Sequence, residues 1–374
     1  MLICLAGLAL MSALGTALVR ALLDEDDPYL AAGSGCLAAL LIELGLTQLL
    51  RPFVGYGPGA LLALVILTTA GLVAWCRAPG RPFQWLELQK SHKAALLLLT
   101  ACAYFAMHTH EVKAPEDDFF IHFPLISLLA RGHYPPLNPF FAQLPLFGHF
   151  GRDLLISLLT HLNGDQILPA TWALNHALQL ASLALGVGLG YRSARAPGAV
   201  LLPWFLFCGI SVGSRAGLID TYDNNNGMVY AGLLMLVHWL VSCRRKSTWA
   251  ILGFLLGTYA IVYETHMLLF VTMVGFAIFS VRSRTGVAIG IALSLVTAAL
   301  MGGPIQDLAM RLFHLRQSEA VGHVEAYESQ RVEMHIPKAR FLQIELGNDS
   351  YRRLSMVFES KLLQSLAPAL DEGG

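Results

Sequence analysis

The chain has 374 residues, of which 55% are hydrophobic and only 13% are charged, and its formal net charge at pH 7 is zero. A soluble domain does not need so large an apolar share, so the composition predicts an integral membrane protein with the lipid bilayer as its first partner. The neutral balance also leaves no basic surface of the kind that binds nucleic acid, and we expect no such partner.

A helix that crosses the bilayer needs about 20 mostly apolar residues, and ten segments approach this length. They are residues 2–23, 30–50, 58–76, 92–110, 167–190, 197–214, 227–243, 249–264, 267–281 and 285–303. We interpret the stretch at 264–267 as a tight turn between two short spans rather than as part of one bent helix. The predicted fold class is all-α, a polytopic membrane helical bundle with about ten transmembrane helices.

The lysines and arginines of short loops predict the orientation, because such loops favour the cytoplasmic side. Basic residues gather at 77–93, 192–195, 244–246 and 282–284. When the ten spans are threaded in order, these loops fall on one side, which we assign to the cytoplasm. The loops at 111–166, 215–226 and 264–266 then face outward. The acidic loop Asp24–Asp27 falls among the basic loops, an irregularity in the pattern.

The outward loop 111–166 is too long for a simple connection. Apolar residues at helical spacing within 122–131 and 152–162 predict two short interfacial helices. Pro135, Pro136 and other turn residues between them impose extended backbone.

The expected domain organisation has three parts. We divide the chain into N-terminal transmembrane helices (1–91), a transmembrane module (92–303), and a polar C-terminal tail or small helical segment (304–374).

Acidic residues recur in all three outward loops. They are Asp117 and Asp118, then Asp220 and Asp223, then Glu264 with His266 beside it. Carboxylates from separate loops on one face can hold a divalent cation, or can act as general base and electrostatic stabiliser. The alternative is helix capping for Asp220 and Asp223, and a polar turn for Glu264 and His266.

Arginines break the inside bias of basic residues in the outward loops. These are Arg131, Arg152 and Arg215. An arginine on this face suits a phosphate or pyrophosphate at the headgroup level. The alternative is snorkelling at the interface or pairing with a carboxylate.

A few polar side chains fall inside the predicted spans. They are Glu43, Gln48, Asn175, His176 and Gln179. Such residues usually face the bundle and pair with one another, so we expect them to join helices rather than to form a site.

The long outer loop resembles the first outer loop of polytopic GT-C glycosyltransferases. The resemblance lies in Asp117-Asp118-Phe-Phe-Ile-His122-Phe-Pro-Leu, then Arg131-Gly-His-Tyr-Pro-Pro-Leu-Asn-Pro139, then Leu146-Phe-Gly-His-Phe-Gly-Arg-Asp153-Leu-Leu. That superfamily, which includes bacterial lipid-linked aminoarabinose and mannosyl transferases, places an acidic pair after a membrane helix, then two interfacial helices, two spans and a second acidic loop. The same order runs through 92–303, although three spans precede the first helix of the pattern here.

The resemblance implies a glycosyltransferase of the bacterial inner membrane with its active loops on the outer, periplasmic face, acting in the cell envelope. Its donor would be a sugar on polyprenyl phosphate, and transfer would invert the anomeric carbon. Asp117 or Asp118 would deprotonate the acceptor, and Asp220 or Asp223 would orient it or hold a cation.

The resemblance also places residues near the substrate. Arg131, Arg152 or Arg215 would stabilise the departing phosphate, and His122, Glu264 and His266 would line the substrate site. A divalent cation, Mg²⁺ or Mn²⁺, would be held by Asp118 and Asp220 in those members that use one. The sugar and the acceptor, whether glycolipid, polysaccharide or protein, stay open.

Two other classes of function compete with the enzyme. A transporter or flippase of a lipid-linked or anionic substrate predicts functional charge near the midplane and an inverted repeat, and the sequence has neither. A noncatalytic membrane assembly subunit would use the acidic loops as docking surfaces. Convergence of the acidic loops in one outward cavity would favour the enzyme.

Overall fold

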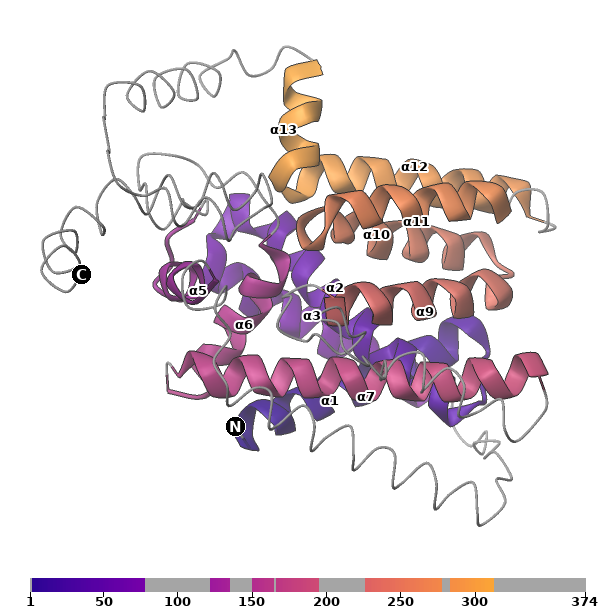
Figure 1. The fold of residues 1–374 in the computed structure, drawn as a ribbon, viewed down its shortest axis with the longest axis horizontal. Helices are drawn as coiled ribbons and strands as arrows, with labels where there is room; N and C mark the ends of the chain where they lie inside the picture. Colours follow the sequence, from indigo (N-terminus) through magenta and orange to yellow (C-terminus); the bar gives the residue numbers. More distant parts are fainter. Residues whose placement is uncertain are drawn as a thin grey trace, which may run out of the picture. The chain divides into compact units, whose positions relative to one another are not determined.

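The computed structural model describes residues 2–77, 122–134, 150–164, 166–194, 226–277 and 283–312. All regular secondary structure within these ranges is helical, and the predicted all-α fold class is confirmed for them (Figure 1). The predicted spans 92–110 and 197–214 lie outside the described residues, as do most of the tail and the boundary at residue 91.

The chain opens with three helices in series, α1 (Leu2–Leu23), α2 (Pro28–Val54) and α3 (Tyr56–Arg77). The Asp27 carboxylate caps α2 by accepting hydrogen bonds from the amides of Tyr29 and Leu30, at 2.8 and 3.0 Å. At the other end of α2, Gly55 has a φ of 85°, and its amide donates to the carbonyl of Arg51. Glycine tolerates this left-handed backbone, so one residue is enough to reverse the chain into α3.

Small residues let α1 and α2 approach closely. A Cβ added at Gly15 would lie 2.0 Å from the carbonyl oxygen of Gly35, so neither helix can carry a larger side chain at the crossing. The same device joins α10 (Lys246–Val262) to α12 (Arg284–Met301), where a Cβ at Gly253 would lie 2.3 Å from the carbonyl oxygen of Gly290. Such crossings are typical of helices that pack within a membrane.

The two short helices expected in the long loop are present as α5 (Phe123–Ala130) and α6 (Gly151–Leu162). α6 packs inside the protein over most of its length, with polar as well as apolar side chains buried, and its expected position at the membrane interface stays a prediction. Arg152 and Asp153 are 2% and 1% exposed. The cause is tertiary packing that no local pattern encodes, since α6 contacts α5, α10 and α7 (Ile167–Ala194).

The remaining described helices are α9 (Asn226–Ser242), α11 (Glu264–Ala277) and α13 (Gly303–Leu312). The predicted tight turn near residue 264 is confirmed, since α10 and α11 are separated by Tyr263 alone, in extended backbone. Across this turn the rings of Tyr259 and Phe270 meet edge to face, with centroids 5.3 Å apart. The two helices therefore fold back on each other as a hairpin.

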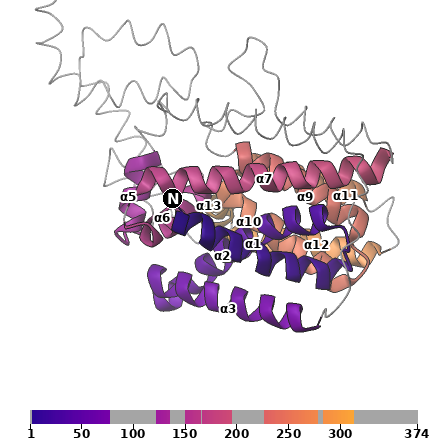
Figure 2. The ribbon, with the colours of Figure 1, turned by 90° about the horizontal axis from the view of Figure 1, so that it is seen from below.

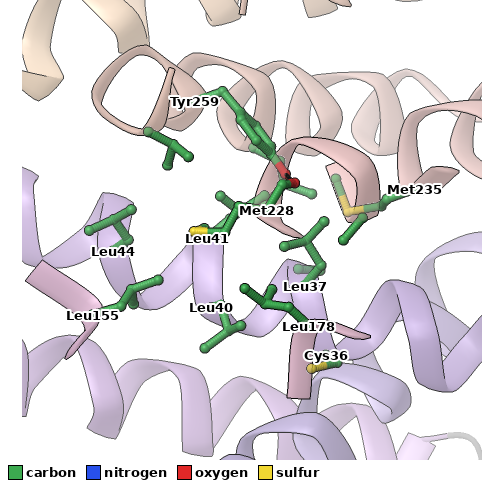
Figure 3. Close-up of a cluster of buried hydrophobic side chains, with 14 of the residues drawn as sticks. Cys36, Leu37, Leu40, Leu41, Leu44, Leu155, Leu178, Met228, Met235 and Tyr259 are labelled. Carbon is green, nitrogen blue, oxygen red and sulfur yellow. Dashed lines mark hydrogen bonds between the residues drawn. The ribbon is translucent and has the colours of Figure 1, made fainter. Parts of the chain in front are cut away.

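α2 is the central element of the bundle. Figure 2 shows it between α3 and α7, and its apolar face meets side chains from α6, α7, α9 and α10 in a continuous core (Figure 3). The core residues labelled in Figure 3 are Cys36, Leu37, Leu40, Leu41, Leu44, Leu155, Leu178, Met228, Met235 and Tyr259. Close packing of these side chains holds α2 at the centre of the fold, because within a bilayer van der Waals contact rather than removal from water joins the helices.

Five described helices are long and apolar enough to cross a bilayer, namely α1, α2, α3, residues Ile167–Gly190 of α7, and α12. Shorter apolar helices occupy three further predicted spans, at Ala231–Ser242, Lys246–Val262 and Glu264–Phe276. On α3, Leu61, Leu72 and Trp75 are 65%, 54% and 67% exposed, an apolar surface that is compatible with contact to lipid. The span count of ten stays a prediction.

The acidic loop between α1 and α2 is neutralised by basic residues from other loops. Arg192, at the end of α7, donates to both Glu25 oxygens at 2.7 and 2.9 Å. Arg245 pairs with Asp24 at 2.9 Å, and Arg20 lies 3.6 Å from Asp26. We call this end of the bundle the basic end. The irregular acidic loop in the sequence is therefore the counter-charge for arginines on its own side.

Glu25 is the centre of a buried network at the basic end, which we call the Glu25 network and define as Glu25, Ser34, Arg192 and His238. His238 is fully buried, with Nε2 2.7 Å from Glu25 Oε2 and Nδ1 hydrogen-bonded to the Ser34 hydroxyl. Burial alone would raise the pKa of Glu25. Hydrogen bonds from His238, the Asp27 amide and Arg192 outweigh burial and lower that pKa to about 2. Glu25 therefore stays ionised in the folded protein.

The ends of α10 offer a direct test of the predicted orientation. Ser247 and Thr265 are both exposed, one at the start of α10 and the other just beyond its end. In a variant without native cysteines, we expect a membrane-impermeant maleimide added to intact cells to label Thr265→Cys, and to label Ser247→Cys only after permeabilisation. Labelling of both from the same side would contradict the orientation and the crossing of α10.

Candidate functional site

The candidate site lies at the end of the bundle opposite the basic end. Five of the predicted site residues fall outside the described residues, namely Asp117, Asp118, Asp220, Asp223 and Arg215. Their convergence, and the candidate cation ligands Asp118 and Asp220, therefore stay predictions. Within the described ranges no group of three or more histidine, cysteine, aspartate or glutamate side chains is arranged to hold a metal ion.

His122 is anchored at the start of α5 by a carboxylate from α6. Its Nδ1 lies 3.0 Å from both oxygens of Asp153, whose side chain is 2% exposed. An Nδ1–H that donates to a buried carboxylate fixes both the ring orientation and the tautomer. Asp153 lies in the first turn of α6, where the helix dipole favours a negative charge. The motif in the sequence contained Asp153, but no local signal identified it as the partner of a residue 31 positions away.

The two described arginines of the predicted site have different surroundings. Arg131 follows the last turn of α5 and is exposed. Arg152 is buried, and its guanidinium donates to the Asn175 side-chain oxygen on α7 at 3.3 Å. This hydrogen bond ties α6 to α7, so Asn175 joins helices as expected. Arg152 is therefore placed inside the bundle, whereas Arg131 is open to a ligand.

The segment before α6 is bound to the end of α10, next to the turn into α11. The Phe150 amide donates to the Ile261 carbonyl at 2.9 Å. A Cβ added at Gly151 would lie 2.9 Å from the Val262 side chain. In the turn itself, the His266 ring packs edge-on against the Tyr263 ring, with centroids 4.5 Å apart, and Glu264 begins α11. The predicted outer loop 111–166 is thus held against the end of α10, next to the predicted outer loop 264–266.

A cluster that the sequence did not single out lies on α2 beside these loops. We call it the Arg51 cluster and define it as Gln48, Arg51, Tyr56 and Tyr134. The Tyr134 hydroxyl donates to Gln48 Oε1 at 2.7 Å, and Arg51 Cζ lies 3.6 Å above the centre of the Tyr134 ring. The Tyr134 ring stacks on Tyr56 at 6.1 Å, and the Tyr56 hydroxyl lies 2.8 Å from the Ser157 hydroxyl. The cluster connects α2, α3, α6 and the segment after α5.

Burial reinforces the protonated state of Tyr134. Although the Arg51 charge opposes the effect, burial raises the pKa of Tyr134 to about 12. The phenol therefore keeps its proton at neutral pH and remains the donor to Gln48. Gln48 was expected to join elements of the bundle, and this bond does so. Glu43 differs from that expectation, because its one described hydrogen bond comes from Thr47 on the same helix, at 3.5 Å.

Comparisons with protein-family models, curated proteins and solved structures found no match to this chain.

Proposed function

We propose that the chain is a membrane glycosyltransferase that moves a sugar from a polyprenyl-phosphate donor to an acceptor on the outer face of the membrane. The proposal begins from the resemblance of residues 92–303 to GT-C enzymes. The observation that supports it is the hydrogen bond from the Phe150 amide, in the predicted outer loop 111–166, to the Ile261 carbonyl in the last turn of α10, which holds this loop beside the turn that leads into α11. Loops that only connect helices do not need this mutual support.

The acidic pair would stand next to an anchored residue. Asp118 precedes His122 by four positions, and His122 is held by Asp153 of the buried helix α6. This anchor fixes the point at which the acidic segment enters α5. A general base must stay within hydrogen-bond reach of the proton that it removes, so such a fixed entry point favours catalysis over a freely moving loop.

The proposed reaction is a direct displacement. The acceptor oxygen or nitrogen forms a bond to the anomeric carbon while Asp117 or Asp118 takes its proton. The bond from the anomeric carbon to the phosphate oxygen breaks, and polyprenyl phosphate leaves with the bonding electrons. Asp220 or Asp223 orients the acceptor or holds a cation, and Arg131 or Arg215 offsets the charge that develops on the phosphate.

A transfer assay in membranes tests this proposal. We expect membranes that contain the chain to move label from at least one member of a panel of hexosyl and pentosyl polyprenyl phosphates into a new product, at a rate well above that of membranes without the chain. The panel is needed because the sugar is not encoded in a readable motif. Absence of transfer from every donor, at verified protein levels and with Mg²⁺ and Mn²⁺ supplied in turn, would contradict the proposal.

A further inference from the structure

We infer that the Arg51 cluster binds the phosphate group of a lipid at the membrane surface. The identity of that lipid as polyprenyl phosphate rests on the proposed function, whereas the phosphate chemistry rests on the cluster itself. Neither Arg51 nor Tyr134 belongs to the residues that the resemblance assigns to the substrate.

Arg51 carries a positive charge that has no counter-charge among the described residues. Its guanidinium lies over the Tyr134 ring, with Cζ 3.6 Å from the ring centre, and its buried Nε has no hydrogen-bond acceptor. By contrast, Arg20, Arg192 and Arg245 at the basic end each form an ion pair with an acidic side chain. An unpaired, partly buried guanidinium is costly unless an anion completes it.

Gln48 supplies a second unsatisfied donor beside the first. Its side chain is 1% exposed, and its oxygen is taken by the Tyr134 hydroxyl, while its Nε2 has no partner. The amide and the guanidinium contact the same phenol ring, one at the hydroxyl and one on the face. Two donors without acceptors, held against the same ring, suit an oxygen-rich anion, since both groups need only acceptors.

The position of Arg51 near the end of α2 indicates that a lipid supplies this anion. Arg51 lies one turn before the end of α2, and the last two residues of the helix, Phe53 and Val54, are apolar and are 84% and 44% exposed. The cluster therefore lies where apolar surface gives way to the polar end of the bundle. The planar fork of arginine, fixed by stacking on Tyr134, matches two phosphate oxygens. A lipid phosphate at the level of the headgroups would lie at this border and would supply the two oxygens.

Binding can be measured without any acceptor, using the full chain in phosphatidylcholine nanodiscs and labelled polyprenyl phosphate as the probe. We expect Arg51→Ala to weaken binding at least tenfold and Arg51→Lys to recover part of it, because lysine keeps the charge without the fork. Arg77→Ala, an exposed arginine at the end of α3, is the matched control and should bind like the wild type. Equal binding by Arg51→Ala and wild type would overturn the inference.

Gln48→Glu tests the site in a variant that we expect to fold. The new carboxylate can still accept from Tyr134 and gives Arg51 an internal counter-charge, so thermal stability should be kept while phosphate binding falls at least tenfold. Undiminished binding in this variant would count against the site.

Competitors separate the sources of phosphate. Displacement of the probe by unlabelled polyprenyl phosphate, and by inorganic phosphate only at much higher concentration, supports a lipid phosphate site. Equal displacement by phosphatidylglycerol would support a lipid phosphate site and overturn its assignment to polyprenyl phosphate, whereas equal displacement by inorganic phosphate would overturn the lipid as the source of the phosphate.

Transfer measured in parallel separates this inference from the proposed function. Tight, Arg51-dependent binding without transfer to any acceptor would support the site and contradict the enzyme. Full transfer by Arg51→Ala with unchanged binding would overturn the site and leave the enzyme in place.

Discussion

Replacement of the catalytic base in the Asp117-Asp118 pair by asparagine is expected to slow sugar transfer by about 10²–10⁴-fold. Asparagine keeps the size and part of the hydrogen bonding of aspartate, but it cannot take a proton from the acceptor. Because a polar outer segment carries the pair, we expect the protein level and thermal stability to stay near those of the wild type. The measurement is the initial rate of transfer at matched protein level in membranes.

Glu116→Gln is the matched control for this experiment, because Glu116 is the acidic residue directly before the pair. Its substitution removes one negative charge without touching the pair, so transfer should change by less than about threefold if the pair is the base. Near-full transfer by both Asp117→Asn and Asp118→Asn would exclude the pair as the catalytic centre. A noncatalytic membrane subunit would then be the better interpretation.

The helices could be predicted from the sequence because the length of an apolar run is a local property. The bounds of α1, α3 and α12 differ from the predicted spans by only a few residues. The hairpin of α10 and α11 was also readable, since Glu264 and His266 interrupt two short apolar runs. In each case the signal lies within about 20 residues of sequence.

The contacts between helices could not be predicted from the sequence, because they join residues that are far apart in the chain. Nothing near Asp153 indicates His122, and nothing near Glu25 indicates His238, 213 positions away. The loop Asp24–Asp27 was an irregularity in the sequence and became a counter-charge only when α7 and α10 were placed beside it. The positive-inside rule considers each loop by itself, whereas an ion pair depends on which loops lie next to each other in the fold.

The residues of the Arg51 cluster could not be predicted from the sequence for the same reason. Gln48 was expected to join helices, and its described hydrogen bond instead joins α2 to the non-helical segment after α5. The stacking of Arg51 on Tyr134 likewise depends on a residue 83 positions further along the chain. An arginine near the end of a span predicts snorkelling on local grounds. Only the packing of Tyr134 against α2 and α3 turns it into a fixed donor, and this is why the sequence indicated other arginines first.

Glu25→Gln is expected to lower the free energy of unfolding by about 3–5 kcal/mol, the usual effect of breaking a buried ion pair. Glutamine presents an NH₂ group where Glu25 now accepts from Arg192 and His238, so at least one donor loses its acceptor. The measurement is the thermal unfolding midpoint of the purified chain in detergent. Asp24→Asn is the control, because the Asp24–Arg245 pair is exposed and should contribute at most about 1 kcal/mol.

The pH dependence of that difference gives a second, independent check of the Glu25 network. The pKa of Glu25 is lowered from 4.5 to about 2 in the folded chain, so its stabilising effect is present above pH 4.5 and is lost as the pH falls toward 2. The midpoint of the wild type should therefore approach that of Glu25→Gln across this window. A gap that persists unchanged down to pH 2 would show that the charge of Glu25 does not hold the basic end together, and would leave only the shape of the side chain to explain the loss.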